Sequence, residues 1–180
     1  MKVKDQVHDA NYSIYNSDCM DVVSELPANS IDLVIYSPPF CGLYNYSSDH
    51  RDFSNCESRD QFVQQYEFLI SELSRATKPG RINAVHVEDI HDNTGRLWDF
   101  PGEVIRIHEK HGFEYHNRIT IWKEPLKVRM RTMVQSLMHK FIVEDATKCF
   151  TAMPDYVLIF KKRGENAVPV VHPNGLNDYE

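Results

Sequence analysis

The feature that most constrains the fold of this chain is a strand-length apolar run that ends in two prolines, IDLVIYSPPF at residues 31–40. A run of Ile, Leu and Val without polar alternation is typical of a strand buried on both faces of a parallel sheet. Two consecutive prolines fix two φ angles and remove two amide donors, so they cannot continue the ladder of the sheet. We therefore expect a strand over 31–37 and a rigid corner made by Ser37, Pro38, Pro39 and Phe40.

Strand and helix patterns alternate along the rest of the chain. Before the corner we expect a strand over 12–16 and a helix over 19–26. After it we expect helices within 58–80, 101–112 and 129–141, and strands over 81–90, 113–123 and 155–162. This order predicts an α/β fold with a doubly wound, mostly parallel sheet and antiparallel strands at its C-terminal edge. We expect one domain over 1–162 and a polar tail over 163–180.

Composition and charge exclude several classes of protein. No apolar run approaches the ~18 residues that a membrane span needs, and the N-terminus has no signal-peptide pattern, so we expect a cytosolic protein. The net charge of −6 argues against a chain that coats nucleic acid by charge alone, although a local basic face stays open. The four cysteines form no CxxC pair, so we expect neither a disulfide framework nor a metal site.

The corner after the strand has the groups that an exocyclic amine would need. In open α/β sheets, ligands bind beyond the carboxyl ends of the strands, which is where Ser37 to Phe40 lie. The Ser37 hydroxyl oxygen and the Pro38 carbonyl could accept the two amine hydrogens of cytosine or adenine and free the nitrogen lone pair for attack. The Phe40 ring could stack on a base rotated out of a duplex. A proline strand stop without a site fits the four residues equally well.

Most of residues 12–172 resemble the amino-directed DNA methyltransferases, in which [DNS]-P-P-[YFW] is the catalytic motif. The similar stretches are YNSDCMDVVSELPANSIDLVIYSPPF, ELSRATKPGRINAVHVEDI, DFPGEVIRIHEKHGFEYHNRITIWKEP and PDYVLIFKK, and they are typical of the phage and prophage branch. Members of this family transfer a methyl group from S-adenosylmethionine to N4 of cytosine or N6 of adenine. The resemblance therefore implies a Rossmann-like class I methyltransferase sheet and double-stranded DNA as the substrate.

The resemblance also implies roles for individual residues. Ser37, Pro38, Pro39 and Phe40 would activate and stack the target base, and Ser in the first position leans toward cytosine N4. Asp18 matches the family's acidic position near the cofactor's adenine, with Cys19 beside it. Asp18 could also be the N-cap of the helix that follows, and both roles can hold at once.

One part of the family's pattern is missing from the sequence. The F-x-G-x-G turn that holds the cofactor is absent, because no two of the seven glycines have the required spacing. A second polypeptide could supply this cofactor half, the chain could be shortened or a decayed gene, or it could recognise DNA without catalysis. We favour a split enzyme whose sheet is incomplete without a partner chain or a homo-oligomer. A methyltransferase of RNA or of a protein glutamine is a weaker alternative.

DNA contacts are expected from two regions. A basic stretch of Lys123, Lys127, Arg129, Arg131 and Lys140 could bind phosphates, but it could equally be a solvated helix face. The polar loop over 41–57 contains Tyr44, Tyr46 and Arg51, which could close over a flipped base. An ordinary surface loop is the alternative for this second region. An enzyme of this kind would act in the cytoplasm of a bacterial or phage-infected cell.

Overall fold

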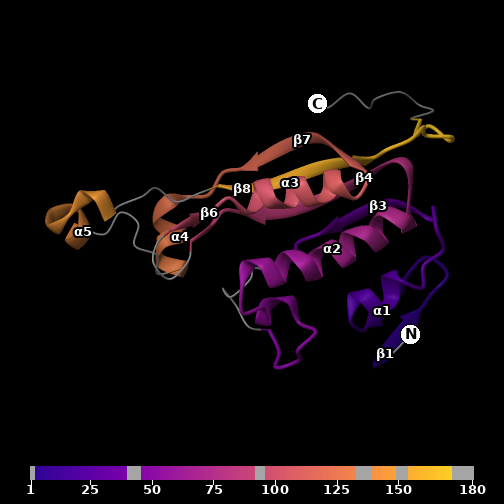
Figure 1. Ribbon diagram of the computed structural model, residues 1–180, viewed down its shortest axis with the longest axis horizontal. Helices are drawn as coiled ribbons and strands as arrows, with labels where there is room; N and C mark the ends of the chain where they lie inside the picture. The colour runs from indigo at the N-terminus through magenta and orange to yellow at the C-terminus, as the bar shows by residue number, and fades with distance from the viewer. Residues whose placement is uncertain (1–2, 40–45, 92–95, 133–138, 149–153, 172–180) are drawn as a thin grey trace.

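A four-stranded sheet forms the centre of the computed structural model, which describes residues 3–39, 46–91, 96–132, 139–148 and 154–171. Its strands lie in the order β3 (Ile31–Tyr36), β4 (Thr77–Glu88), β8 (Asp155–Lys162) and β7 (Phe113–Ile121). β3 is parallel to β4, whereas β8 is antiparallel to both of its neighbours. Three strands thus run in one direction, with β8 reversed between β4 and β7 (Figure 1). The α/β class and the antiparallel C-terminal strand are confirmed.

Two helices cover one face of this sheet. α2 (Arg59–Ala76) begins at Ser58, whose hydroxyl accepts a hydrogen bond from the Gln61 amide at 3.2 Å. α3 (Phe100–Lys110) begins at an Asp99 cap and has Pro101 in its first turn. Both helices direct apolar side chains at helical spacing into the core. The largest fully buried side chains come from these helices and from the sheet face beneath them: Phe62, Tyr66, Ile70, Phe100, Val104, His108, Val85, Val87, Phe113, Leu158 and Phe160.

The opposite face of the sheet is largely open, which differs from our expectation of a strand buried on both faces. Successive side chains of a strand point to opposite faces, so Leu33 and Ile35 lie on the open face while Val34 and Tyr36 point toward the helices. Leu33 is 54% and Ile35 is 74% exposed, and Ile119 on β7 is 52% exposed. Among the described residues β3 pairs only with β4, so its outer edge is also unpaired. Part of the apolar run therefore lies on a face of the sheet that the described residues do not cover.

The N-terminal strand expected over 12–16 does not join the central sheet. β1 (Asp5–His8) and β2 (Ser13–Asn16) instead pair with each other as an antiparallel hairpin. α1 (Cys19–Val23) follows and contacts α2. Arg75 near the end of α2 fixes the end of α1, because its guanidinium donates to the carbonyls of Val23, Ser24 and Leu26 at 2.7–3.0 Å. The hairpin and α1 therefore lie outside the central sheet, next to α2 (Figure 1).

Several element boundaries differ from the predicted ones. β4 begins at Thr77, earlier than expected, because Thr77 pairs with Ile31 and Gly80 then adopts a φ of +74° at a register shift. The helix expected over 129–141 corresponds to α4 (Pro125–Thr132) and α5 (His139–Glu144), and residues 133–138 lie outside the described chain. α4 and α5 lie beyond the end of the sheet at which β3 and β4 finish (Figure 1).

Short elements complete the described structure. They are β5 (Ile90–His91), which pairs with β6 (Leu97–Trp98), and the 3-10 turns η1 (Phe53–Asn55) and η2 (Ala146–Lys148). The start of the predicted tail lies against the sheet end, where Arg163 donates its amide to the Gly112 carbonyl at 3.0 Å. The domain boundary at 162/163 stays a prediction. Across the described segments, every helix is too short or too polar to cross a membrane.

Candidate functional site

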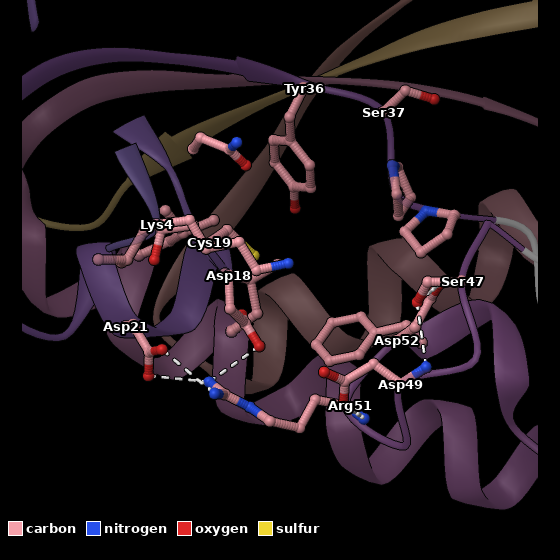
Figure 2. Close-up of a pocket in the computed structure, with 18 of the residues that line it drawn as sticks. Lys4, Asp18, Cys19, Asp21, Tyr36, Ser37, Ser47, Asp49, Arg51 and Asp52 are labelled. Carbon is pink, nitrogen blue, oxygen red and sulfur yellow. Dashed lines mark hydrogen bonds and ion pairs between the residues drawn. The ribbon is translucent and has the colours of Figure 1, made fainter. Parts of the chain in front are cut away.

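The proline corner lies at the carboxyl end of β3, on the rim of a cavity of about 690 Å³ (Figure 2). Pro38 is buried and Pro39 is half-buried, so the corner is held in place by its surroundings. The walls come from the N-terminal segment, β3, the corner, the loop before η1 and the side of α2. The lining residues include Lys4, Asn16, Asp18, Cys19, Val34, Tyr36, Ser37, Pro38, Pro39, Asp49, Arg51, Phe53 and Leu69.

Asp18 faces this cavity from the start of α1. One carboxylate oxygen accepts the Met20 amide at 2.8 Å, which confirms the predicted N-cap. The other oxygen lies 2.8 Å from Nη2 of Arg51. The same guanidinium group also donates from its two terminal nitrogens to the two carboxylate oxygens of Asp21 (Figure 2). Cys19 follows as an exposed thiol. The structure therefore brings both expected cofactor residues to the cavity and places Arg51 beside them. The roles predicted for these three residues stay predictions.

Tyr36 from β3 forms the floor of the cavity. Its hydroxyl lies 2.6 Å from the Tyr66 hydroxyl and 3.4 Å from Nε2 of His108. Burial raises the pKa of Tyr36 well above its usual value, so the phenol stays neutral. Burial also lowers the pKa of His108 to about 4, and His108 Nδ1 donates to the Val104 carbonyl at 2.8 Å. His108 Nε2 is therefore an acceptor, and the floor is uncharged.

The Ser37 side chain points away from the cavity, toward β4 (Figure 2). Its hydroxyl donates to the His86 carbonyl at 3.1 Å and lies 3.4 Å from His86 Nδ1. The other ring nitrogen, Nε2, lies 3.2 Å from Oδ2 of Asp155. The register of the sheet explains this group, because Tyr36 pairs with Val85 and His86 pairs with Val157. Ser37, His86 and Asp155 therefore form a continuous polar row across three strands.

Lys123 extends this row at the end of β7. Its ammonium group forms ion pairs with Glu88 and with Asp155, and the three side chains are 13%, 22% and 15% exposed. Burial would lower the pKa of Lys123, but hydrogen bonds and charge from Asp155 and Glu88 raise it, so Lys123 is a cation. Burial would likewise raise the pKa of Asp155, but the Lys123 contacts hold it below its usual value. This enclosed position differs from the phosphate-binding surface predicted for Lys123.

The other predicted DNA contacts are only partly visible. Tyr46 is 66% exposed and its amide donates to the Ser54 hydroxyl. Lys127 and Lys140 are exposed on α4 and α5. Phe40 and Tyr44 lie outside the described residues, as do the side chains of Arg129 and Arg131. The DNA-binding role of these residues stays a prediction.

Sequence reasoning missed most of the polar row behind Ser37. None of His86, Asp155 and Glu88 was expected at the site. Tyr36 was also missed, although it is the residue next to the corner. Strand register is the signal that could have found the row, because the carboxyl ends of β3 and β4 lie beside each other and beside the amino end of the antiparallel β8. This signal can be used only when the position of β8 between β4 and β7 is known, and the sequence alone does not predict that position.

The comparisons with known proteins agree with the site. No family model matches the chain. In sequence it is similar to the Type II methyltransferase M.BglII of Bacillus subtilis, with 27% identity over 112 residues, which are 62% of this chain and 29% of that protein. This match supports the resemblance to amino-directed DNA methyltransferases that the motifs indicated.

Solved structures show the same fold. A candidate DNA modification methylase of Thermus thermophilus, TTHA0409, matches with a TM-score of 0.61 and 18% identity, over 85% of this chain and 53% of that one. The same protein complexed with S-adenosyl-L-methionine gives a TM-score of 0.57 and 19% identity, over 85% and 56%. The cytosine-N4-specific PvuII DNA methyltransferase gives 0.56 and 17%, over 81% and 47%. The class I methyltransferase fold is confirmed, and this chain spans about half the length of these structures.

Proposed function

We propose that this chain is the base-binding half of an S-adenosylmethionine-dependent DNA amino-methyltransferase. The observation that carries the proposal is the position of Ser37, Pro38 and Pro39 at the carboxyl end of β3, on the rim of a cavity of about 690 Å³ with Asp18 on its wall. A cavity of this size falls in the range of small-ligand sites, which are roughly 300–1,000 Å³. The corner therefore adjoins a space in which a methyl donor could lie.

The proposed target is N4 of cytosine. Serine in the first position of the corner leans in this direction, and the PvuII enzyme, which shares the fold, is cytosine-N4-specific. N6 of adenine is the alternative, because both amines present two hydrogens on a nitrogen conjugated to its ring. Both reactions need the target nucleotide outside the duplex stack.

The residues around the cavity fit one side of the cofactor. Val34, Phe53 and Leu69 give an apolar wall suited to a purine ring, and the Asp18 carboxylate suits the hydroxyl or amino groups of an adenosine. Arg51 now holds one Asp18 oxygen, so a cofactor that bonds to Asp18 must share or replace that ion pair. When bound, S-adenosylmethionine supplies an activated methyl group on a sulfonium.

The corner would prepare the amine for attack. The Pro38 carbonyl and the Ser37 hydroxyl oxygen accept its two hydrogens and draw the nitrogen toward tetrahedral geometry. Ser37 can do this because its own proton is donated to the His86 carbonyl, which leaves its lone pairs open. In this proposal Phe40 stacks on the flipped base, and Tyr46, Lys127 and Lys140, with Tyr44, Arg129 and Arg131, contact the surrounding DNA. The enzyme would act in the cytoplasm of a bacterial or phage-infected cell.

A second polypeptide with the F-x-G-x-G turn is the proposed partner. The outer edge of β3 and the face that carries Leu33 and Ile35 support this proposal, because exposed apolar side chains beside an unpaired strand edge are a docking surface for another strand and its helices. The solved structures that share the fold are about twice as long as the part that this chain matches. A homo-oligomer that covers the same edge is the alternative.

Methyl transfer to DNA tests the proposed function. The chain is co-expressed with an adjacent reading frame that carries the glycine turn, and transfer of a labelled methyl group to duplex DNA is measured. We expect Ser37→Ala to reduce the rate by about 10²-fold or more, the range for a lost hydrogen-bond partner of the reacting group. Phe40→Ala should also reduce it, because the flipped base loses a stacking contact worth about 1–3 kcal/mol. Ser13→Ala on the N-terminal hairpin is the matched control. If both corner variants retain the rate of the control, the corner is not the catalytic site.

A further inference from the structure

The polar row behind Ser37 has the geometry of a proton relay. We propose that His86 accepts, through the Ser37 hydroxyl, the proton that the target amine must lose, and that Asp155 positions the imidazole for this task. The inference rests on the proposed methyl transfer and adds two residues to it. Ser37 would be the catalytic residue that touches the amine, and His86 and Asp155 would act through it.

The distances define one direction for the relay. Ser37 Oγ lies 3.1 Å from the His86 carbonyl oxygen and 3.4 Å from His86 Nδ1, so both acceptors lie on the same side of the hydroxyl. A rotation of the hydroxyl hydrogen changes its acceptor from the carbonyl to the ring without moving a heavy atom. On the far side of the ring, Nε2 lies 3.2 Å from Asp155 Oδ2. The amine, Ser37, His86 and Asp155 would therefore follow one another in a line.

The surroundings of the ring select the required tautomer. Because Asp155 is a carboxylate beside Lys123, it accepts a hydrogen bond, so the neutral ring carries its proton on Nε2. Nδ1 is then an acceptor that faces the Ser37 hydroxyl. The charged and titratable groups near the ring are Asp155 on β8, Glu88 on β4 and Lys123 after β7. Their formal charges sum to one net negative charge.

The corner separates the relay from the cavity. Tyr36 lies on the α2 side of the sheet, whereas strand register places the side chains of His86 and Asp155 on the opposite face, and Ser37 lies between them at the rim of the cavity. An amine held at the corner would thus meet the methyl donor on one side and the proton acceptor on the other. His86 is 40% exposed, so the proton can pass from the ring to water after each turnover.

The step balances with these groups alone. The amine nitrogen forms a bond to the methyl carbon, the carbon–sulfur bond breaks, and its electron pair goes to sulfur, which loses its positive charge. The nitrogen then carries a positive charge and one surplus proton. This proton moves to Ser37 Oγ while the hydroxyl proton moves to His86 Nδ1, so Ser37 is unchanged and His86 becomes an imidazolium. Release of that proton to water restores the neutral ring.

The relay is tested first on the chain itself by nuclear magnetic resonance of its ¹⁵N-labelled histidine rings at pH 8. We expect the His86 signals, identified by their loss in His86→Gln, to show the tautomer protonated on Nε2. Asp155→Asn should allow the other tautomer to appear. A His86 ring protonated on Nδ1 in the wild-type chain would overturn the relay, because no acceptor would then face Ser37.

Catalysis is tested in single-turnover methyl transfer by the assembled enzyme between pH 5 and 8. We expect the wild-type rate to fall in acid, where a protonated His86 can no longer accept. His86→Gln should lower the rate by about 10²-fold, the lower range for a lost proton acceptor, and should remove this acid limb. His116→Gln, an exposed imidazole on β7, is the matched control. Circular dichroism of each variant separates a folding defect from a catalytic one.

The outcomes distinguish the relay from the function on which it rests. If the assembled wild-type enzyme is active and His86→Gln retains its rate and its acid limb, the relay is wrong and the proposed function stands. If the wild-type pair transfers no methyl group, the proposed function itself is wrong, and the relay is overturned with it. A slower His86→Gln that keeps the acid limb would also overturn the relay, because it would show a structural role only.

Discussion

Acid should destabilise this protein through one buried histidine. His108 on α3 is fully buried, stacks on Phe160 with ring centroids 3.9 Å apart, and donates Nδ1–H to the Val104 carbonyl. Its pKa is lowered by burial to about 4, from an ordinary value of 6.5. The unfolded chain therefore takes up a proton at a higher pH than the folded chain does, and protonation favours unfolding.

The size of the effect follows from the two pKa values. Stability from the neutral ring is fully present above pH ~6.5, is lost as the pH falls toward ~4, and changes little further below that. At about 1.4 kcal/mol for each pKa unit, the full loss is about 3.5 kcal/mol. Between pH 7.5 and pH 4.5 we expect about 2.5 kcal/mol of it. This is a large part of the roughly 5–15 kcal/mol that stabilises an ordinary domain.

Urea denaturation at the two pH values measures this contribution. Because carboxylates also titrate in this range, the informative quantity is the difference between the wild type and His108→Gln, which lacks the titrating ring. We expect the variant to be less stable at pH 7.5 but to lose about 2.5 kcal/mol less on acidification. His8→Gln, an exposed imidazole on the hairpin, is the control. An equal acid loss in the wild type and His108→Gln would refute the assignment of a neutral, buried His108.

Two further substitutions test contacts around the site. Lys123→Met should cost about 2 kcal/mol at pH 8 and less at pH 5, because it leaves the carboxylates of Glu88 and Asp155 without their cation until they protonate. Lys78→Met, whose ion pair with Asp32 is exposed, should cost below about 1 kcal/mol in the same urea titrations. Arg75→Met should cost about 2 kcal/mol and loosen α1 in hydrogen exchange, because three carbonyls lose a charged donor. Arg106 forms an exposed i,i+3 ion pair with Glu103 on α3, so Arg106→Met should change the free energy of unfolding little. Equal losses of stability in the two arginine variants would contradict the role given to Arg75.

The sequence predicted the elements whose signals are local. The alternation of strands and helices, the helices within 58–80 and 101–112 and the strand at 155–162 all follow from short-range rules, and the structure confirms them. Asp18 was expected as a helix cap and as a cofactor residue. The cap is confirmed and Asp18 lines the cavity, while its cofactor role stays a prediction. The proline corner was located correctly for the same reason, since its geometry depends on its own residues.

Features that depend on distant partners could not be predicted in this way. The strand at 31–36 was predicted to be buried on both faces, but Leu33 and Ile35 are exposed on one of them. An apolar composition does not say which part of a protein, or which chain, covers a strand. Lys123 looked like one of several basic surface residues until strand order placed it between Glu88 and Asp155. The sequence also did not indicate that Arg51 forms ion pairs with Asp18 and Asp21, and the DNA contact predicted for Arg51 stays a prediction.

The central claim is that this chain binds the base and that a second chain completes the cofactor site on the open edge of β3. Calorimetric titration with S-adenosylmethionine tests it most directly, first with the isolated chain and then with its complex with the polypeptide that carries the glycine turn. We predict weak or no binding by the isolated chain, micromolar binding by the complex, and loss of complex formation in Ile35→Asp but not in Val170→Asp, a control at another exposed apolar residue. Micromolar binding by the isolated chain would contradict the claim.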